Sequence, residues 1–358
     1  MQTTTQSSTI SLPSTDDIWS GQQLIKQLQA KAESVLDPLI PPASSIALLD
    51  YPNNPNVGDS LIWLGEIAYL KSRNIKLDYV CDTRNYCHKE LAETLGKNSI
   101  ILIHGGGNFG TLWPEEQQFR LRVLRDFPGQ PIIQFSQSIH FADPLVLEET
   151  AQAIRAHGNY TLLARDKPSF DFASEHFECK VILCPDMAFF IGSIKSRPNP
   201  PFDRFILART DHETSGNWIE QLPNLQQGLR VDASDWLQAS RYERFIGRIE
   251  RHTARLRRIV DPRNKVLFLL WNHLAKQRLI RGQHLLERGR VIIADRLHVH
   301  ILALLLDKPH AVIDNTTRKI SSLHQTWTRP YQGVAFVTDL KEAFRAAENF
   351  DSRVRQDA

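Results

Sequence analysis

The alternation of short apolar runs with longer amphipathic stretches is the feature that most constrains how this chain can fold. From residue 45 onward, short β-branched runs are separated by stretches with helical periodicity. This alternation indicates βα units, whose strands form a parallel sheet. In the first half of the chain, the predicted strands are residues 45–49, 76–80, 100–103, 131–135, 160–164 and 180–183.

A proline-rich segment, residues 196–204, interrupts this pattern and predicts a hinge or linker. The alternation then restarts, with predicted strands at residues 205–208, 266–270, 291–294, 311–313 and 334–337. A chain of 358 residues is long enough for two domains with separate cores. We predict a flexible tail and lead-in helix over residues 1–43, one domain over 44–195 and a second over 205–358. Ligands usually bind in the cleft at the carboxyl ends of such strands.

The charges are distributed unevenly between the two halves. Residues 1–198 hold 17 Lys and Arg against 22 Asp and Glu, a net charge of −5. The remaining residues hold 26 against 18, a net charge of +8. We therefore expect the second half to bind anions.

Other features of the composition limit where the protein acts and what it binds. No apolar run has the length needed to span a bilayer, and the N-terminal residues lack the features of a secretory signal. We expect a cytoplasmic protein without a nucleic-acid partner. Cys81 and Cys87 with His88 fit no common zinc pattern, so we expect no metal.

The first motif, PNNPNVGDSLIWLGE, starts at Pro52 and directly follows a predicted strand. Asn and Gly favour a tight turn, and Asp59 falls where the next helix begins. An acidic residue there could act in a ligand site or serve only as a helix cap. Both interpretations are kept.

The second motif, HGGGNFG, follows a strongly apolar strand and contains Gly105, Gly106, Gly107 and Asn108. It formally matches the G-x-G-x-x-G dinucleotide pattern, but no helix starts at once and no acidic strand end follows about twenty residues later. We reject a dinucleotide site. The adjacent glycines indicate the close approach of a ligand or another backbone segment.

Polar residues also follow three further strands. His140 ends the motif QFSQSIHF, Arg165 lies in LLARDKPSF and Asp186 lies in LCPDMAFF. The first cluster fits sugar hydroxyls or a hydrogen-bonded turn, with His140 as a candidate for acid–base chemistry. Arg165 and Asp186 fit a site or a salt bridge equally well.

The most specific motif is VIIADRLHVHILALLLDKPHAVIDN, which starts at Val291. Arg296 and His298 open an apolar helix directly after a strand, and such a helix start suits phosphate and carboxylate groups. A structural role for both residues is the alternative.

Arginines also form a stripe on one predicted helix: Arg241, Arg244, Arg248, Arg251, Arg255 and Arg258. Apolar residues form a neighbouring stripe. The favoured interpretation is a solvated basic face on a packed helix. The alternative is contact with pyrophosphate or with anionic lipid at the inner membrane surface.

The order and spacing of these motifs, ending in ADRLHVHILALLLDKPHAVIDNTTRK, resemble the polysaccharide pyruvyl transferase family over roughly residues 45–345. The resemblance implies two Rossmann-like domains facing a cleft, similar to GT-B glycosyltransferases. It also implies phosphoenolpyruvate as the donor substrate, no separate cofactor, and a pyruvate ketal formed on a sugar of a bacterial exopolysaccharide or other surface glycan, with an acceptor that is lipid-linked or a free polymer.

The resemblance also implies roles for individual residues. Arg296 and His298 match the family's Arg-Leu-His signature, and Arg165, Asp59 and Lys319 match single motif positions. We expect the three basic residues Arg165, Arg296 and Lys319 to bind the donor, with His298 as the general acid. Asp59 is the favoured base, with His140 and Asp186 as alternatives.

Two other functions are compatible with the predicted architecture. A nucleotide-sugar glycosyltransferase of polysaccharide biosynthesis would share it, and a non-catalytic glycan-binding protein would bind sugar without releasing phosphate.

Overall fold

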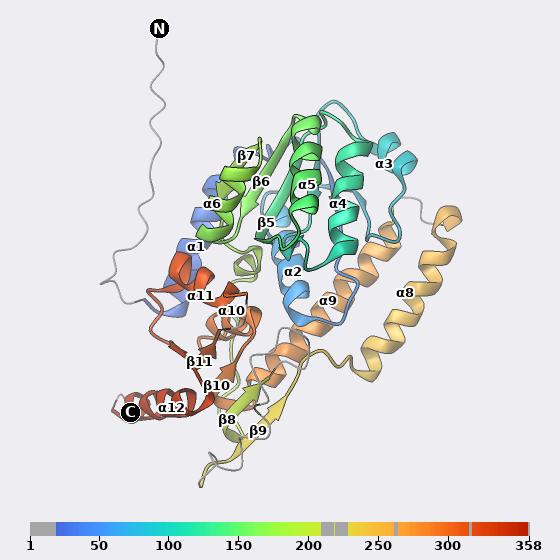
Figure 1. Cartoon of the computed structure of the whole chain (residues 1–358). Helices are drawn as coiled ribbons and strands as arrows, with labels where there is room; N and C mark the ends of the chain where they lie inside the picture. Colours follow the sequence, from blue (N-terminus) through green and yellow to red (C-terminus); the bar gives the residue numbers. More distant parts are fainter. Residues whose placement is uncertain (1–18, 209–217, 219–227, 261–263, 315–316, 357–358) are drawn as a thin grey trace.

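The computed structural model describes residues 19–208, 218, 228–260, 264–314 and 317–356. Within these residues the chain forms two sheets in which all paired strands are parallel, each flanked by helices (Figure 1). The predicted α/β class with two parallel sheets is therefore confirmed. No helix of the described residues is long and apolar enough to cross a membrane.

The first sheet has the strand order β2-β1-β3-β5-β6-β7, and β4 pairs with β5. Its strands are β1 (Ser45–Leu49), β2 (Leu77–Val80), β3 (Ser99–Ile103), β4 (Gly106–Gly110), β5 (Ile132–His140), β6 (Tyr160–Ala164) and β7 (Lys180–Leu183). Helices α2 (Val57–Ser72), α3 (His88–Thr94), α4 (Pro114–Asp126), α5 (Pro144–His157) and α6 (Lys167–His176) connect them, and the 3₁₀ helix η1 (Met187–Ile191) follows β7.

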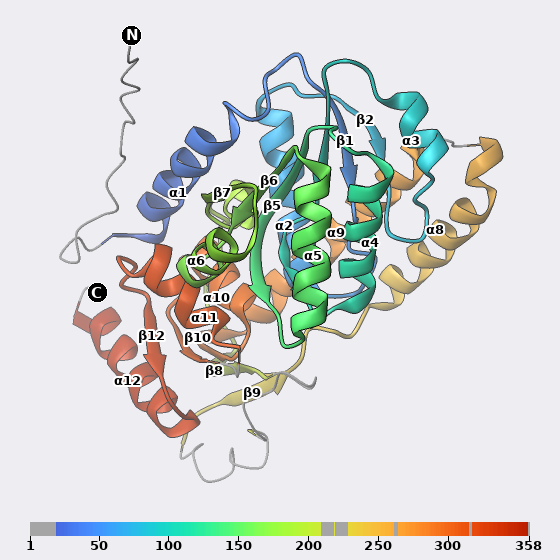
Figure 2. The same cartoon turned by 45° about the horizontal axis from the view of Figure 1, so that its top comes forward.

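Alternate residues of the strands of the first sheet other than β4 face two different cores, because successive side chains of a strand point to opposite faces. Ile46 and Leu48 of β1 pack in the core that includes α2. Ala47 and Leu49 pack in the core on the other face, which α3, α4, α5 and α6 cover (Figure 2). Both faces are therefore apolar, which explains the continuous apolar runs of the sequence.

The second sheet has the strand order β12-β11-β10-β8-β9. Its strands are β8 (Phe202–Leu207), β9 (Val231–Ser234), β10 (Gly289–Ala294), β11 (His310–Ile313) and β12 (Val334–Val337). The other helices of the described residues are α1 (Gly21–Leu36), α8 (Arg241–Val260), α9 (Lys265–Leu286), α10 (Leu297–Leu305), α11 (Lys319–Leu323), the π-helical η3 (His324–Thr328) and α12 (Leu340–Gln356).

One apolar core joins the two halves. Val57 and Leu61 of α2 and Phe189 of η1 pack in the same cluster as α10 and as Ile292 of β10. Burial of this shared surface holds the two sheets in a set orientation, since removing apolar area from water is the main stabilising force in folding. Each sheet also reverses its strand order at one point, between β1 and β3 and between β8 and β10.

The structure corrects one predicted strand. Residues 266–270 belong to α9, in which Leu267, Trp271, Leu274, Ala275 and Arg278 are buried. Their spacing follows the helical period, whereas a five-residue apolar window by itself fits a strand equally well. Trp271 packs against the first sheet, so the helix lies on that half of the molecule although it follows the proposed linker.

The sequence analysis also missed two strands and placed the start of a third too late. Strand β4 was not predicted because it is rich in glycine, and β9 was not predicted because its sequence VDAS is largely polar. Both depart from the usual composition of strands. Strand β8 begins at Phe202, inside the segment 196–204 assigned to a linker. The domain boundaries themselves stay a prediction.

Substitution of Gly65 in α2 tests the close packing of α2 on η1. A Cβ at this position would lie 1.8 Å from the backbone oxygen of Met187. We expect Gly65→Ala to lower the free energy of unfolding by about 1–3 kcal/mol, as overpacking does. Denaturant unfolding would measure this loss.

Gly247→Ala in α8 is the matched control, because its Cβ would meet only Arg251 Nη1, at 3.8 Å. That variant should gain about 0.5–1 kcal/mol, as alanine favours a helix over glycine. Equal stability of the two variants would contradict the packing described here.

Candidate active site

A cavity of about 610 Å³ lies where the carboxyl ends of the two sheets face each other. Asp50 follows β1 and His104 follows β3, which flank the point of reversed strand order in the first sheet. Arg296 follows β10, which flanks the corresponding point in the second sheet. Doubly wound sheets bind their ligands at such points, so the topology itself places the site.

Most of the residues that the sequence analysis selected line this cavity: Asp59, Gly105, Gly107, Asn108, Arg165, Arg296, His298 and Lys319. The other three predicted residues are not among the described residues that line the cavity: Gly106, His140 and Asp186. Gly106 adopts a φ of 127° in β4, which glycine tolerates. Asp186 is buried directly behind the wall, and the backbone oxygen of His140 accepts a hydrogen bond from Thr111.

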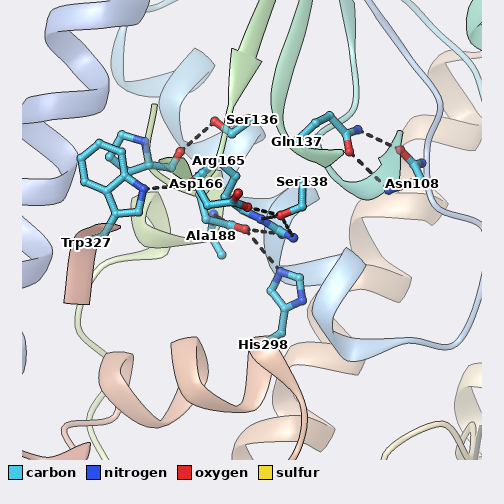
Figure 3. A network of polar contacts seen from close by, with 12 residues as sticks. Asn108, Ser136, Gln137, Ser138, Arg165, Asp166, Ala188, His298 and Trp327 are labelled. Carbon is cyan, nitrogen blue, oxygen red and sulfur yellow. Dashed lines mark hydrogen bonds and ion pairs between the residues drawn. The ribbon is translucent and has the colours of Figure 1, made fainter. Parts of the chain in front are cut away.

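Arg165 is held in place by a buried polar network to which both halves of the molecule contribute (Figure 3). Its Nη1 lies 2.8 Å from Asp186 Oδ2, and its Nε and Nη2 donate to Ser138 Oγ at 3.2 and 2.9 Å. The Trp327 indole donates to the backbone oxygen of Arg165 at 2.6 Å. These contacts hold the guanidinium in one orientation beside the cavity.

His298 reaches the same carboxylate from the second half of the molecule. It lies in the first turn of α10, and its imidazole points toward Arg165 (Figure 3). His298 Nε2 is 3.5 Å from Asp186 Oδ2. Gly58 of α2 permits this position, because a Cβ there would lie 2.6 Å from His298 Nδ1.

Asp186 remains ionised in this environment. Burial alone would raise its pKa, but the hydrogen bond and charge of His298 and the charge of Arg165 hold the pKa well below the usual range. The backbone N–H of Ala188 also donates to Oδ1, at 2.9 Å. The carboxylate therefore accepts a hydrogen bond from the guanidinium and faces the imidazole at ion-pair distance, so it orients both groups.

Two cationic groups converge beside Gly107. A Cβ at this glycine would lie 3.4 Å from both Arg165 Nη2 and Lys319 Nζ. Lys319 is the first residue of α11, so the second half supplies one of these cations and the first half the other. The glycine leaves space for a small anion to approach both groups.

Arg296 adds a third positive charge at the N-cap of α10. Its Nη2 lies 2.9 Å from both carboxylate oxygens of Asp235, which follows β9. The sequence analysis missed this partner because it missed β9. The backbone N–H groups at the start of α10 add to the attraction for an anion at this end of the cavity.

Carboxylates also line the cavity: Asp50, Asp59, Asp82, Glu115 and Glu116. Asp59 Oδ2 accepts hydrogen bonds from the amides of Asn54 and Asn56 at 3.0 and 3.1 Å. Trp113 lines the cavity near these acids and is 42% exposed. The cavity thus combines basic groups with acidic and aromatic ones.

Asp50 is a candidate that the sequence analysis missed. It follows β1 with a φ of 70°, an uncommon conformation for a residue other than glycine. Burial raises its pKa to about 7, although the charges of His104 and Arg120 oppose the shift. The sequence did contain an indication of this candidate, because Asp50 is an acidic residue directly after the first strand. The other motifs were selected for the same position after a strand.

His104 and Glu66 anchor the glycine motif. Glu66 Oε2 lies 2.9 Å from His104 Nδ1, and Oε1 accepts from the backbone N–H of Gly105 at 2.9 Å. Burial would lower the pKa of His104, but the charge and hydrogen bond of Glu66 raise it. The pair fixes the turn between β3 and β4, which brings Gly107 and Asn108 to the cavity.

Asp186→Asn tests the shared carboxylate. The variant leaves Arg165, which is 1% exposed, without its countercharge, so we expect a loss of about 3–5 kcal/mol at neutral pH. The pKa of Asp186 is lower in the folded protein than in the unfolded chain. The stabilisation that its ionised carboxylate provides is therefore complete above about pH 4 and is lost as the pH falls. Denaturant unfolding over a pH series should show the two proteins converging in acid.

Asp171→Asn provides the matched control, since Asp171 pairs with Lys167 at the surface and the side chain is 57% exposed. The Asp171→Asn variant should lose less than about 1 kcal/mol of its free energy of unfolding. A similarly small loss in Asp186→Asn, or one that does not change with pH, would contradict the role of Asp186.

Comparison with known proteins identifies the family. The sequence profile described as Polysaccharide pyruvyl transferase matches residues 56–317. Pyruvyl transferase 1 of Schizosaccharomyces pombe is 33% identical over 319 residues, which cover 82% of this chain and 73% of that protein. A Bacillus subtilis protein named "Putative pyruvyl transferase EpsO" is 29% identical over 307 residues, which cover 84% of this chain and 90% of that protein.

A solved structure shares the fold. It is that of a protein from Klebsiella pneumoniae described as functional uncharacterized protein KP1_0663, with a TM-score of 0.57 and 18% identity. The likeness covers 87% of this chain and 99% of that chain, and it supports the fold alone. From the match to the family profile and from the two pyruvyl transferase relatives, the chain belongs to the polysaccharide pyruvyl transferase family.

Proposed function

We propose that this protein transfers a pyruvyl group from phosphoenolpyruvate to a sugar of a surface polysaccharide and forms a pyruvate ketal. The observation that carries the proposal is the set of basic groups, Arg165, Arg296, His298 and Lys319, in one cavity that also presents carboxylates. Family membership supports the transfer of a pyruvyl group to a saccharide. The identity of the donor rests on the charges of the cavity.

Phosphoenolpyruvate suits the basic part of the cavity. It carries a carboxylate and a phosphate, about three negative charges in all when fully ionised. Arg165 and Lys319 approach the same space beside Gly107, and Arg296 lies at the start of α10. Guanidinium groups contact carboxylate and phosphate in a bidentate manner, so they orient the donor as well as bind it.

The chemistry requires proton transfers at defined atoms. The methylene carbon of the donor gains a proton, and one sugar hydroxyl loses its proton and bonds to the adjacent carbon. A second hydroxyl then bonds to that carbon and loses its proton, while the carbon–oxygen bond to phosphate breaks and phosphate leaves. We propose His298 as the acid for the first step, because Asp186 orients its imidazole beside the donor space.

Two carboxylates are candidates for the base that takes the sugar proton. Asp59 remains the prediction from the sequence, and two amide donors position it at the cavity wall. Asp50 is the second candidate, favoured by its buried position at the wall and by its pKa of about 7. A base with a pKa near the working pH combines a useful fraction of the ionised form with adequate basicity.

The direct test is incubation with phosphoenolpyruvate and a panel of synthetic or lipid-linked glycosides, with phosphate release and product mass recorded. A product heavier by one pyruvate ketal, formed with equimolar phosphate, is the expected result. Thermal stabilisation by nucleoside diphosphates but not by phosphoenolpyruvate, without phosphate release, would favour a nucleotide-sugar glycosyltransferase instead.

His298→Ala should lower turnover by about 10²- to 10⁴-fold, the usual contribution of one positioned acid. Binding of phosphoenolpyruvate, measured by calorimetry, should be retained because the three basic groups stay in place. His176→Ala at the exposed end of α6 is the control and should keep full turnover. Full activity in His298→Ala would remove it as the acid.

The pH dependence of turnover distinguishes the two candidate bases. If Asp50 is the base, its ionised form increases as the pH rises through about 7, so turnover should rise over the same interval. In Asp50→Asn this rise should disappear together with most of the turnover. If Asp59→Asn removes the rise and Asp50→Asn keeps it, the assignment to Asp50 is wrong.

A further inference from the structure

The outward face of α8 combines two stripes that run along the helix. Tyr242, Phe245, Ile249 and Leu256 form an apolar stripe, with exposed fractions of 48, 52, 39 and 57%. Beside it lies an exposed basic stripe, Arg241, Arg244, Arg248, Arg251 and Arg255. We refer to these nine residues as the α8 face.

Buried contacts fix the rotation of α8, so the α8 face cannot turn inward. Glu243 Oε1 lies 3.0 Å from Arg281 Nε of α9, and Glu250 Oε1 accepts from the Trp271 indole at 3.1 Å. Near the end of α8, Arg257 Nη1 lies 2.5 Å from Glu90 Oε2 of α3.

In the same arrangement the acidic side chains of α8 face the interior, so they add no negative charge to the outer surface of the helix. The sequence of α8 contains two acidic residues, Glu243 and Glu250, and both are buried. Over the described side chains of residues 241–257, the α8 face therefore presents arginines and apolar groups without a carboxylate. In both views of the molecule α8 lies at the margin, beside α9 (Figures 1 and 2).

A solvated basic face explains only half of this pattern. Water accounts for five exposed arginines, but it does not favour four large apolar side chains aligned on the same surface. A helix that lies in a membrane interface has this composition, with basic groups at the lipid phosphates and aromatic or aliphatic groups at the acyl boundary. Leu269 of α9, the helix that packs against α8, is also exposed, at 67%.

We propose that the α8 face docks the protein on an anionic lipid surface. The complementary charge specifies the partner, because an arginine near such a surface strengthens binding by about fivefold, equivalent to about 1 kcal/mol. The apolar stripe then inserts between head groups and limits the orientation of the bound protein.

This surface is linked to the cavity through one side chain. Glu250 accepts a hydrogen bond from Asn53 Nδ2 at 3.0 Å, and Asn53 lines the cavity. Docking through the α8 face would therefore hold the cavity close to the lipid surface, where a lipid-anchored acceptor is concentrated. The docking proposal goes beyond pyruvyl transfer and does not depend on it.

Vesicle flotation of the full chain tests the proposal. Vesicles of phosphatidylcholine are compared with vesicles in which one third of the lipid is phosphatidylglycerol. We expect binding to the anionic vesicles that weakens with added salt and little binding to the neutral ones. The triple variant R244A/R248A/R251A should bind about a hundredfold more weakly, and F245S/I249S should also lose binding.

The matched control is R122A/R125A/R155A, which removes the same charge from exposed arginines of α4 and α5. It should bind vesicles like the unaltered protein. Circular dichroism and thermal unfolding check that every variant is folded, and phosphate release in solution should not change in the arginine variants.

Several results would overturn the proposal. They are no binding to anionic vesicles, equal binding to neutral vesicles, or the same loss in the control as in R244A/R248A/R251A. Concentration-dependent dimers that F245S/I249S abolishes, without vesicle binding, would show that a second copy of the chain covers the α8 face.

Discussion

The Asp186 carboxylate is the interaction on which the candidate site depends. It accepts a hydrogen bond from Arg165 of the first half of the molecule and forms an ion pair with His298 of the second half. A buried carboxylate with only one of these partners would carry a large desolvation penalty, so the site is complete only when the two halves pack together. The shared apolar core around α2, η1 and α10 provides that packing. The packing that joins the two halves therefore also completes the site.

Glycines at the contacts allow this convergence. Gly58 leaves space for the imidazole of His298, and Gly107 leaves space beside Arg165 and Lys319. In both places a methyl group would occupy volume beside a basic side chain. The site therefore combines a rigid polar network with open backbone, a combination that favours the binding of a compact, multiply charged ligand.

The sequence predicted most of the strands, and most of the site residues that it predicted line the cavity, for a shared reason. Strands buried on both faces produce apolar runs, and the predicted site residues follow those runs closely, as Arg165 and Arg296 do. The prediction failed where this rule fails. The apolar window 266–270 lies in a long helix, β4 is rich in glycine, and β9 is polar. Asp235 was missed together with β9. Asp50 was missed although it directly follows β1, and the burial and backbone conformation that make it a candidate are not readable from neighbouring residues.

By itself, the sequence determined the local properties of the chain: the parallel α/β class, the motifs after the strands and the excess of positive charge in the second half. These follow from the order of apolar and polar residues along the chain. Only the tertiary structure decided that Asp186 lies behind the wall while Asp50 lies on it, and that His140 lies outside the cavity lining. It also decided that the five arginines of the α8 face point outward while Arg257 is buried. Such outcomes depend on contacts between residues far apart in the sequence, and packing selects those contacts after the local elements have formed.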